Sequence, residues 1–258
     1  MEYNKIIQGD CLEVMPNIPD KSIDMILCDL PYGTTACKWD TIIPFEPLWK
    51  QYKRMIKDNG AIVLTGSEPF SSYLRMSNIK DYKYDWIWRK NTGTGFAIAK
   101  YQPLKYHENI LVFGKGRMNY NPIPTERFSE TSKRVCKKLV RGGGKSTSKH
   151  IAMDIIKVQY NSETKSPESV LEFKSVPNSG GNKLHPTQKP VALFEYLIKT
   201  YTNKGDLVLD NCAGSGTTGV ACKNLGRDYI LIEKEEKYIE IIQKRIKAIP
   251  ETLFDIAK

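Results

Sequence analysis

Long apolar runs, paired cysteines and histidines are scarce in this sequence of 258 residues. No run of about 18 apolar residues occurs, so no transmembrane helix is expected. The N-terminal MEYNKIIQGD also lacks the basic and apolar regions that are typical of a secretory signal. The six cysteines are scattered without a C-x-x-C pair, and only three histidines are present. These features predict a cytoplasmic protein with reduced thiols and no zinc site.

Basic residues are abundant and unevenly distributed. The net charge is +10, and residues 114–165 contain twelve basic and four acidic side chains. A polyanionic partner would explain this excess, because each neutralised phosphate releases counterions. A solvated, mobile loop would explain it equally well, so the charge alone leaves both interpretations open.

Short runs rich in valine and isoleucine alternate with segments of helical periodicity. The runs predict strands at Lys5–Ile7, Ile23–Asp29, Ala61–Thr65, Tyr84–Arg89, Asn109–Gly114, Asp206–Asp210 and Tyr229–Glu233. Apolar residues spaced by three and four predict helices within 45–56, 191–201 and 238–249, the second one capped by Thr187. This alternation predicts an α/β fold with a mostly parallel sheet and helices on both faces.

Residues 116–183 interrupt the alternation. This stretch is basic, contains Gly142-Gly143-Gly144 and lacks long periodic segments, although Val170, Leu171 and Phe173 form an apolar cluster. We therefore predict an inserted lobe at 116–183 within a domain formed by 1–115 and 184–258.

A glycine-rich turn follows the predicted strand Asp206–Asp210. Gly214 and Gly216 would let the backbone turn sharply and approach a ligand, and Thr217 would open a helix. The next strand ends at Glu233, whose carboxylate could accept both hydroxyls of a ribose. The same spacing fits the G-x-G-x-x-G fingerprint of dinucleotide-binding proteins. A glycine turn without a ligand is the third interpretation.

Two observations argue against a dinucleotide. Asp210 stands directly before the turn, where it would repel a pyrophosphate but attract a cation such as the amino group of a methionine moiety. The turn also lies near the C-terminus, with one strand-helix unit after it, which is too little for the second half of a dinucleotide fold.

A tetrapeptide, Asp29-Leu30-Pro31-Tyr32, follows the apolar strand Ile23–Asp29. A carboxylate at the carboxyl end of such a strand lies where α/β sheets bind ligands. The amino group of a nucleobase is a poor nucleophile, because its lone pair is delocalised into the ring. A carboxylate and a backbone carbonyl, each accepting one amino hydrogen, would direct that lone pair at a methyl donor. Stacking on Tyr32 could contribute roughly 1–3 kcal/mol to holding the base. Taken alone, the tetrapeptide could also be an ordinary Asp-x-Pro turn.

Together, the two segments resemble motifs of the DNA amino-methyltransferases. Asp29–Tyr32 is similar to their D-P-P-Y motif, and Asn211–Gly216 is similar to their F-x-G-x-G motif. The order, with the catalytic motif first, is that of the permuted beta group. The resemblance implies a Rossmann-like, seven-stranded sheet with one reversed strand, S-adenosylmethionine as cofactor and double-stranded DNA as partner. It also implies that the insert is the target-recognition region, and related enzymes are often homodimers.

The resemblance assigns roles to individual residues of this sequence. The catalytic residues are Asp29, Leu30 through its backbone carbonyl, Pro31 and Tyr32. The cofactor-binding residues are Asp10, Cys11, Asp29, Thr187, Lys189, Asp210, Asn211, Ala213, Gly214, Gly216, Thr217 and Glu233. Within the insert, the excess of basic charge predicts the DNA-binding residues Lys133, Arg134, Lys137, Lys138, Arg141 and Lys145. Trp86–Lys90 and His107–Asn109 resemble strands that border the target-base pocket. Two departures are Leu30 in place of the usual first proline, and Cys212 where proline or phenylalanine is common.

An aspartate at position 29 favours adenine N6 over cytosine N4 in this family. The sequence therefore predicts a site-specific DNA (adenine-N6) methyltransferase of the restriction-modification kind, acting by base flipping and direct in-line transfer. Cytosine-N4 methylation is the main alternative. An RNA methyltransferase and a non-catalytic DNA-binding relative are less favoured, and the motif order argues against the protein-glutamine enzymes.

Overall fold

The computed structural model divides into two compact units, Met1–Asn121 with Ser169–Lys258, and Pro122–Glu168. It describes residues 3–35, 37, 40–126, 164–177 and 184–250. In the smaller unit, the described residues form a two-stranded antiparallel ladder of β6 (Thr125–Glu126) and β7 (Thr164–Lys165). The larger unit contains the main sheet and all the described helices.

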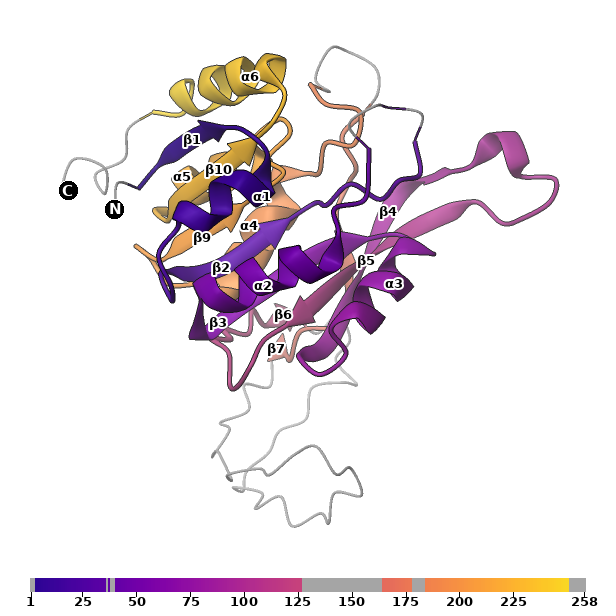
Figure 1. The fold of residues 1–258 in the computed structure, drawn as a ribbon. Helices are drawn as coiled ribbons and strands as arrows, with labels where there is room; N and C mark the ends of the chain where they lie inside the picture. The colour runs from indigo at the N-terminus through magenta and orange to yellow at the C-terminus, as the bar shows by residue number, and fades with distance from the viewer. Residues whose placement is uncertain (1–2, 36, 38–39, 127–163, 178–183, 251–258) are drawn as a thin grey trace, which may run out of the picture. The chain divides into compact units, whose positions relative to one another are not determined.

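The main sheet has eight strands in the order β1-β10-β9-β2-β3-β5-β4-β8 (Figure 1). Within this sheet, β5 alone runs antiparallel to its neighbours, and the remaining neighbours pair in parallel. The strands are β1 (Lys5–Gln8), β2 (Ile23–Cys28), β3 (Ile56–Gly66), β4 (Tyr82–Thr94), β5 (Lys105–Phe113), β8 (Val170–Glu172), β9 (Leu207–Asp210) and β10 (Asp228–Glu233). The predicted α/β class, with a mostly parallel sheet and one reversed strand, is confirmed.

The eighth strand, β8, is the one that the sequence did not predict. It pairs in parallel with β4, where Leu171 lies opposite Trp88. The indole Nε1 of Trp88 also donates to the carbonyl of Phe173 at 2.9 Å. The apolar cluster at 170–173 was expected inside the insert, but a three-residue strand is too short to show alternation. Its partner strand lies about eighty positions earlier in the chain. The function of the remaining insert stays a prediction.

Helices cover both faces of the sheet because successive strand residues point to opposite sides. Met25 and Leu27 pack in one core with the helices that lie within residues 191–247, whereas Ile26 and Cys28 pack in the other with those that lie within residues 11–77. Every residue of β2 is buried, which explains why five of its six residues are apolar; the exception, Asp24, pairs with Lys57. The helices are α1 (Cys11–Val14), α2 (Phe45–Met55), α3 (Phe70–Ser77), α4 (Val191–Tyr201), α5 (Thr217–Leu225) and α6 (Glu236–Lys247). No helix in the described ranges is long and apolar enough to cross a membrane.

The start of α4 differs from the prediction. Pro190, not Thr187, occupies the N-cap, and the helix begins at Val191. The backbone N–H of Thr187 instead donates to Nδ1 of His185 at 3.2 Å. The segment before the helix is therefore a turn of its own. By contrast, α5 begins at Thr217 as predicted, with Gly216 as a left-handed N-cap residue at φ +77°.

Candidate active site

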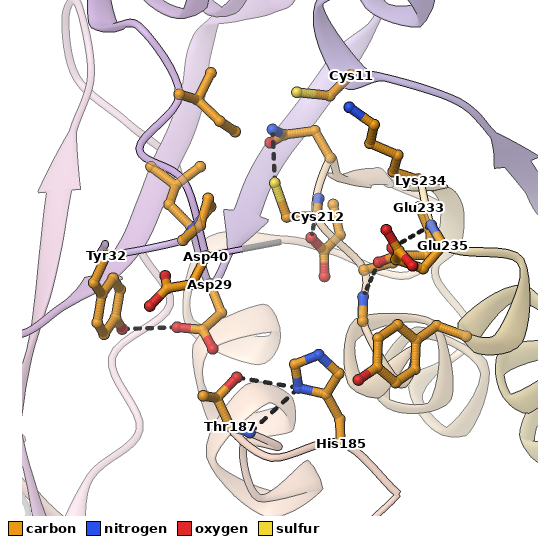
Figure 2. Close-up of a pocket in the computed structure, with 18 of the residues that line it drawn as sticks. Cys11, Asp29, Tyr32, Asp40, His185, Thr187, Cys212, Glu233, Lys234 and Glu235 are labelled. Atoms are coloured by element: carbon orange, nitrogen blue, oxygen red, sulfur yellow. Dashed lines mark hydrogen bonds between the residues drawn. The ribbon is translucent and has the colours of Figure 1, made fainter. Parts of the chain in front are cut away.

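A cavity of about 460 Å³ lies where β2, β9 and β10 end. The carboxyl ends of neighbouring parallel strands meet at one edge of a sheet, where α/β proteins bind ligands. Figure 2 shows Asp29 and Tyr32 facing each other on one side of this cavity, and Glu233 on the other side. Segments far apart in the sequence thus converge on one site.

The cavity gathers most of the residues that the sequence singled out. All four residues of the tetrapeptide line it, and Gly216 is the one predicted cofactor residue that does not. A Cβ at Gly216 would lie 2.9 Å from the side chain of Ile242, so this glycine permits close packing of α6. The predicted DNA-binding residues Lys133, Arg134, Lys137, Lys138, Arg141 and Lys145 lie outside the described residues, and their role stays a prediction.

The Asp29 carboxylate accepts hydrogen bonds from three side chains. The hydroxyls of Tyr32, at 2.7 Å, and of Thr65 both donate to Oδ1. The ammonium of Lys189 donates to Oδ2 at 2.6 Å. Each carboxylate oxygen can accept about two hydrogen bonds, so among the residues that the structure describes Oδ1 is saturated and Oδ2 keeps one acceptor position. Thr65 lies on β3, beside β2, and nothing in the local sequence marked it as part of the site.

Lys189 belongs to a row of four charges, of which the two lysines are buried and the two carboxylates are partly buried. Its ammonium lies 3.4 Å from Oε2 of Glu108, and Oε1 of Glu108 lies 3.1 Å from the ammonium of Lys90. The side-chain exposures are 6% for Lys189 and 18% for Asp29, with 15% for Glu108 and 8% for Lys90. Burial alone would lower the pKa of Lys189, but the charges of Asp29 and Glu108 raise it, so the ammonium stays protonated. The four charges balance one another.

The ring of Tyr32 is held between other side chains. Phe70, from α3, stacks against it with ring centroids 5.0 Å apart and planes inclined by 27°. The ammonium of Lys189 lies 5.6 Å from the Tyr32 centroid. Burial, followed by the charge of Asp29, raises the pKa of the Tyr32 phenol. Tyr32 is therefore a neutral donor that fixes Asp29 and a ring that lines the cavity.

The loop after the tetrapeptide is organised by Asp40, a residue that the sequence analysis did not identify. Its carboxylate accepts the backbone N–H groups of Gly33 at 2.9 Å, Thr34 at 2.9 Å and Thr35 at 2.7 Å. Three N–H donors on one carboxylate fix a tight turn. This turn brings Thr34 and Thr35 to the cavity wall.

Asp210 lies at the base of the glycine turn and is 3% exposed. The Thr218 hydroxyl donates to Oδ2 at 2.5 Å, and the Cys212 N–H donates to Oδ1 at 3.1 Å. Burial raises the pKa of Asp210 to about 6, although these hydrogen bonds act in the opposite direction. A cation bound beside it would favour the ionised form.

Glu233 ends β10 and closes the turn from the other side. Its Oε2 accepts the Gly214 N–H at 2.7 Å, and its Oε1 accepts the Glu235 N–H at 2.9 Å. Burial raises the pKa of this carboxyl. The backbone N–H of Lys234 also faces this carboxylate. A carboxylate can accept about four hydrogen bonds, so acceptor capacity for a hydroxyl remains beside these three donors.

The cavity wall carries more negative than positive side chains, which bears on the ligand that it can bind. Among the described lining residues, six are carboxylates and two are lysines; the carboxylates are Asp10, Asp29, Asp40, Asp210, Glu233 and Glu235. Such a wall attracts a cation that carries hydroxyls and repels a pyrophosphate, which argues against the dinucleotide alternative. The described residues contain no group of three His, Cys, Asp or Glu side chains that could hold a metal ion.

Comparison with known proteins identifies the family. The model of a family described as DNA methylase, covering N6 and N4 methyltransferases, matches residues 23–244. The chain belongs to this family. The type II methyltransferase M.HinfI of Haemophilus influenzae is 30% identical to this DNA methylase, over 98% of the chain and 71% of the relative. M.HpaI of Haemophilus parainfluenzae is also 30% identical, over 94% of the chain and 74% of the relative.

Solved structures show the same fold. The M1.HpyAVI–SAM complex superposes with a TM-score of 0.61 and 27% identity, over 94% of this chain and 98% of that one. The cytosine-N4-specific PvuII DNA methyltransferase superposes with a TM-score of 0.66 at 17% identity, over 97% and 89% of the two chains. At that identity the similarity establishes the fold alone.

Proposed function

We propose that this DNA methylase transfers a methyl group from S-adenosylmethionine to N6 of adenine in duplex DNA. The observation that carries the proposal is the free acceptor position on Oδ2 of Asp29, at the wall of an anionic cavity. Asp29 lies at the carboxyl end of β2, and the glycine turn lies at the end of β9, close by in the same sheet.

The cavity wall fits S-adenosylmethionine, which supplies an electrophilic methyl group when bound. Asp210 would attract its ammonium group, and the carboxylate of Glu233 would accept a hydrogen bond from its ribose hydroxyls. The glycine turn at Gly214 would let the backbone approach closely. The remaining lining residues proposed for the cofactor are Asp10, Cys11, Thr187, Asn211, Ala213 and Thr217.

At the target base, the residues of the tetrapeptide act by position. Oδ2 of Asp29 accepts one amino hydrogen and the backbone carbonyl of Leu30 accepts the other, which directs the nitrogen lone pair at the methyl donor. Tyr32 offers a ring surface for an extruded base. Adenine is proposed over cytosine because an aspartate begins the tetrapeptide.

Incubation with tritiated S-adenosylmethionine and duplex DNA, followed by nucleoside analysis, tests the proposal. We expect label in N6-methyladenine. Label in N4-methylcytosine would contradict the choice of base, and label in RNA alone, in protein alone or in no product would contradict the proposed function.

Asp29→Ala is the matching variant. We expect methyl transfer to fall by about 100- to 1,000-fold, the loss typical of removing one positioned hydrogen-bonding group. Cofactor affinity should change by less than about threefold, because Asp29 serves mainly the base. Asp58→Ala is the control, since Asp58 is exposed and pairs with Lys21 on the surface. A near-normal rate in Asp29→Ala would contradict the mechanism.

A further inference from the structure

Lys189 occupies an unusual place for a residue expected to contact the cofactor. Its ammonium lies on Oδ2 of Asp29, the same oxygen that keeps an acceptor position for the target amino group. An ammonium has three N–H donors. Asp29 accepts one of them at 2.6 Å, and Oε2 of Glu108 lies 3.4 Å from the ammonium. Among the described residues these two carboxylates leave at least one N–H of the ammonium without an acceptor.

We propose that Asp29 and Lys189 act as an acceptor-donor couple that reads the edge of the target base. In this couple, Oδ2 of Asp29 accepts an amino hydrogen, and Nζ of Lys189 donates to the unprotonated ring nitrogen next to that amino group. The inference rests on the proposed function and deepens it, because it assigns the chemical class of base that the pocket accepts.

Nucleobases differ in what they present at this edge. Adenine and cytosine each carry an amino donor beside a ring nitrogen that accepts. Guanine and thymine carry a carbonyl oxygen beside a ring N–H, which is the reverse pattern. The couple therefore fits both amino-bearing bases. With guanine or thymine, the Asp29 oxygen would face a carbonyl oxygen, and the Lys189 ammonium would face a ring N–H, so neither pair could form a hydrogen bond. Reading the Watson–Crick edge of a flipped base in this way is a source of selectivity.

The position of Tyr32 is consistent with such a complex. Phe70 stacks against the Tyr32 ring and the Lys189 ammonium lies over it, so a base would contact the part of the ring that lines the cavity. Lys189 Nζ lies 5.6 Å from the Tyr32 centroid, and the Tyr32 hydroxyl bonds Asp29. A single base can therefore contact the ring, the acceptor and the donor together.

Glu108 and Lys90 are positioning residues for this couple. Glu108 provides a second carboxylate for the ammonium of Lys189, and Lys90 in turn balances the charge of Glu108. Without Glu108, the ammonium would be held by Asp29 alone, and its third donor would lose its fixed direction. Because both side chains are nearly buried, water cannot easily take their place.

Base analogues in the duplex test the inference directly. In 1-deazaadenine the ring nitrogen beside the amino group is replaced by C–H, whereas in 7-deazaadenine a nitrogen remote from that edge is replaced. We expect kcat/KM of the wild-type protein to fall by about 10- to 100-fold with 1-deazaadenine, because a charge-assisted hydrogen bond is lost. With 7-deazaadenine it should stay within about threefold. For a cytosine target, 3-deazacytosine replaces 1-deazaadenine.

The variant Lys189→Met shows whether the lower rate with 1-deazaadenine comes from a lost contact with Lys189 or from the altered electronic properties of the analogue. If Lys189 donates to the ring nitrogen, the ratio between adenine and 1-deazaadenine should shrink to within about threefold in this variant. An unchanged ratio, with or without a raised KM for S-adenosylmethionine, would overturn the inference. Should Lys189→Met not fold, the wild-type data decide: equal rates with the 1-deaza and 7-deaza analogues would overturn it.

Glu108→Gln should lower kcat/KM with adenine and reduce the same ratio. Glu172→Gln is the matched control, since Glu172 forms an exposed ion pair with Arg89 at 2.8 Å. If Glu108→Gln lowers the rate but leaves the ratio intact, the positioning role is wrong. The proposed function would fail differently, with no transfer from the wild-type protein to a duplex containing the natural base.

Discussion

Asp210→Asn should stabilise the ligand-free protein. Asp210 is 3% exposed, and its pKa is raised from 3.8 to about 6, first of all by burial. A buried carboxyl with a raised pKa costs free energy wherever it is ionised. Asparagine has nearly the same shape, and its Oδ1 can keep the hydrogen bond from the Cys212 N–H while its amide faces the Thr218 hydroxyl.

The size of the effect follows from the pKa difference. A rise from 3.8 to about 6 corresponds to about 3 kcal/mol. Because the pKa is higher in the folded state, the penalty is absent below about pH 4, grows between about pH 4 and 6, and is complete above that. The gain in the free energy of unfolding should therefore be about 3 kcal/mol at pH 8 and about half as large at pH 5.

Urea unfolding of the ligand-free wild type and variant at these two pH values measures the effect. The comparison between pH values is its own control, because any loss of packing or hydrogen bonding in the variant is common to both. A gain of equal size at pH 5 and pH 8, or a loss of stability at pH 8, would refute the argument.

The same substitution should weaken cofactor binding. If Asp210 holds the ammonium of S-adenosylmethionine, its neutral replacement should lower the affinity by about 10- to 100-fold. Wild-type affinity should fall as the pH drops below about 6, where Asp210 becomes protonated, and the variant should lack this dependence. Calorimetric titration over this range would show it. Unchanged affinity would remove Asp210 from the proposed cofactor site and leave the stability argument intact.

Three further substitutions test other parts of the structure. Tyr52→Phe removes the donor to the buried Oδ1 of Asn211, at 2.5 Å, and should cost about 1–3 kcal/mol in urea unfolding; a loss below about 0.5 kcal/mol would mean that the bond is dispensable. Gly216→Ala combines a φ of +77° with a Cβ 2.9 Å from Ile242, so it should destabilise by about 1–3 kcal/mol, and by more than Gly95→Ala, where the φ is +92° but the nearest atom is 3.8 Å away. Equal losses would show that packing against α6 is unimportant. Replacing Lys133, Lys137 and Lys138 with glutamine should weaken DNA binding and flatten its salt dependence; unchanged affinity would favour the solvated-loop interpretation.

The sequence determined the elements that depend on local pattern. Seven strands of the main sheet were recognised because each contains a short run of apolar β-branched or aromatic residues. Asp29 and Asp210 were placed at strand ends for the same reason, since a charged residue directly after such a run marks its carboxyl end. The Gly214 and Gly216 turn was recognisable because positive φ angles, observed at +52° and +77°, favour glycine.

Features that depend on pairing between distant segments were not accessible from the sequence. β8 has three residues, and its position is determined by β4 rather than by its own pattern. Thr187 fits the composition of a helix cap, yet it binds His185 and the helix begins four residues later. Local composition in these two segments permits several structures, and long-range contacts select one.

The charge row through the active site is the clearest case of a feature that only the tertiary structure decided. About eighty residues separate Asp29 from Glu108 along the chain, and about eighty more separate Glu108 from Lys189. They meet because β5 pairs with β3 and because the turn before α4 brings Lys189 into contact with both carboxylates. Any of these residues, taken alone, could be a solvated charge. The strand order buries them together, and burial requires that each charge find a partner. The sequence therefore identified Asp29 and Lys189 as separate site residues, whereas only the fold showed that they form an ion pair and that Glu108 lies beside the same lysine.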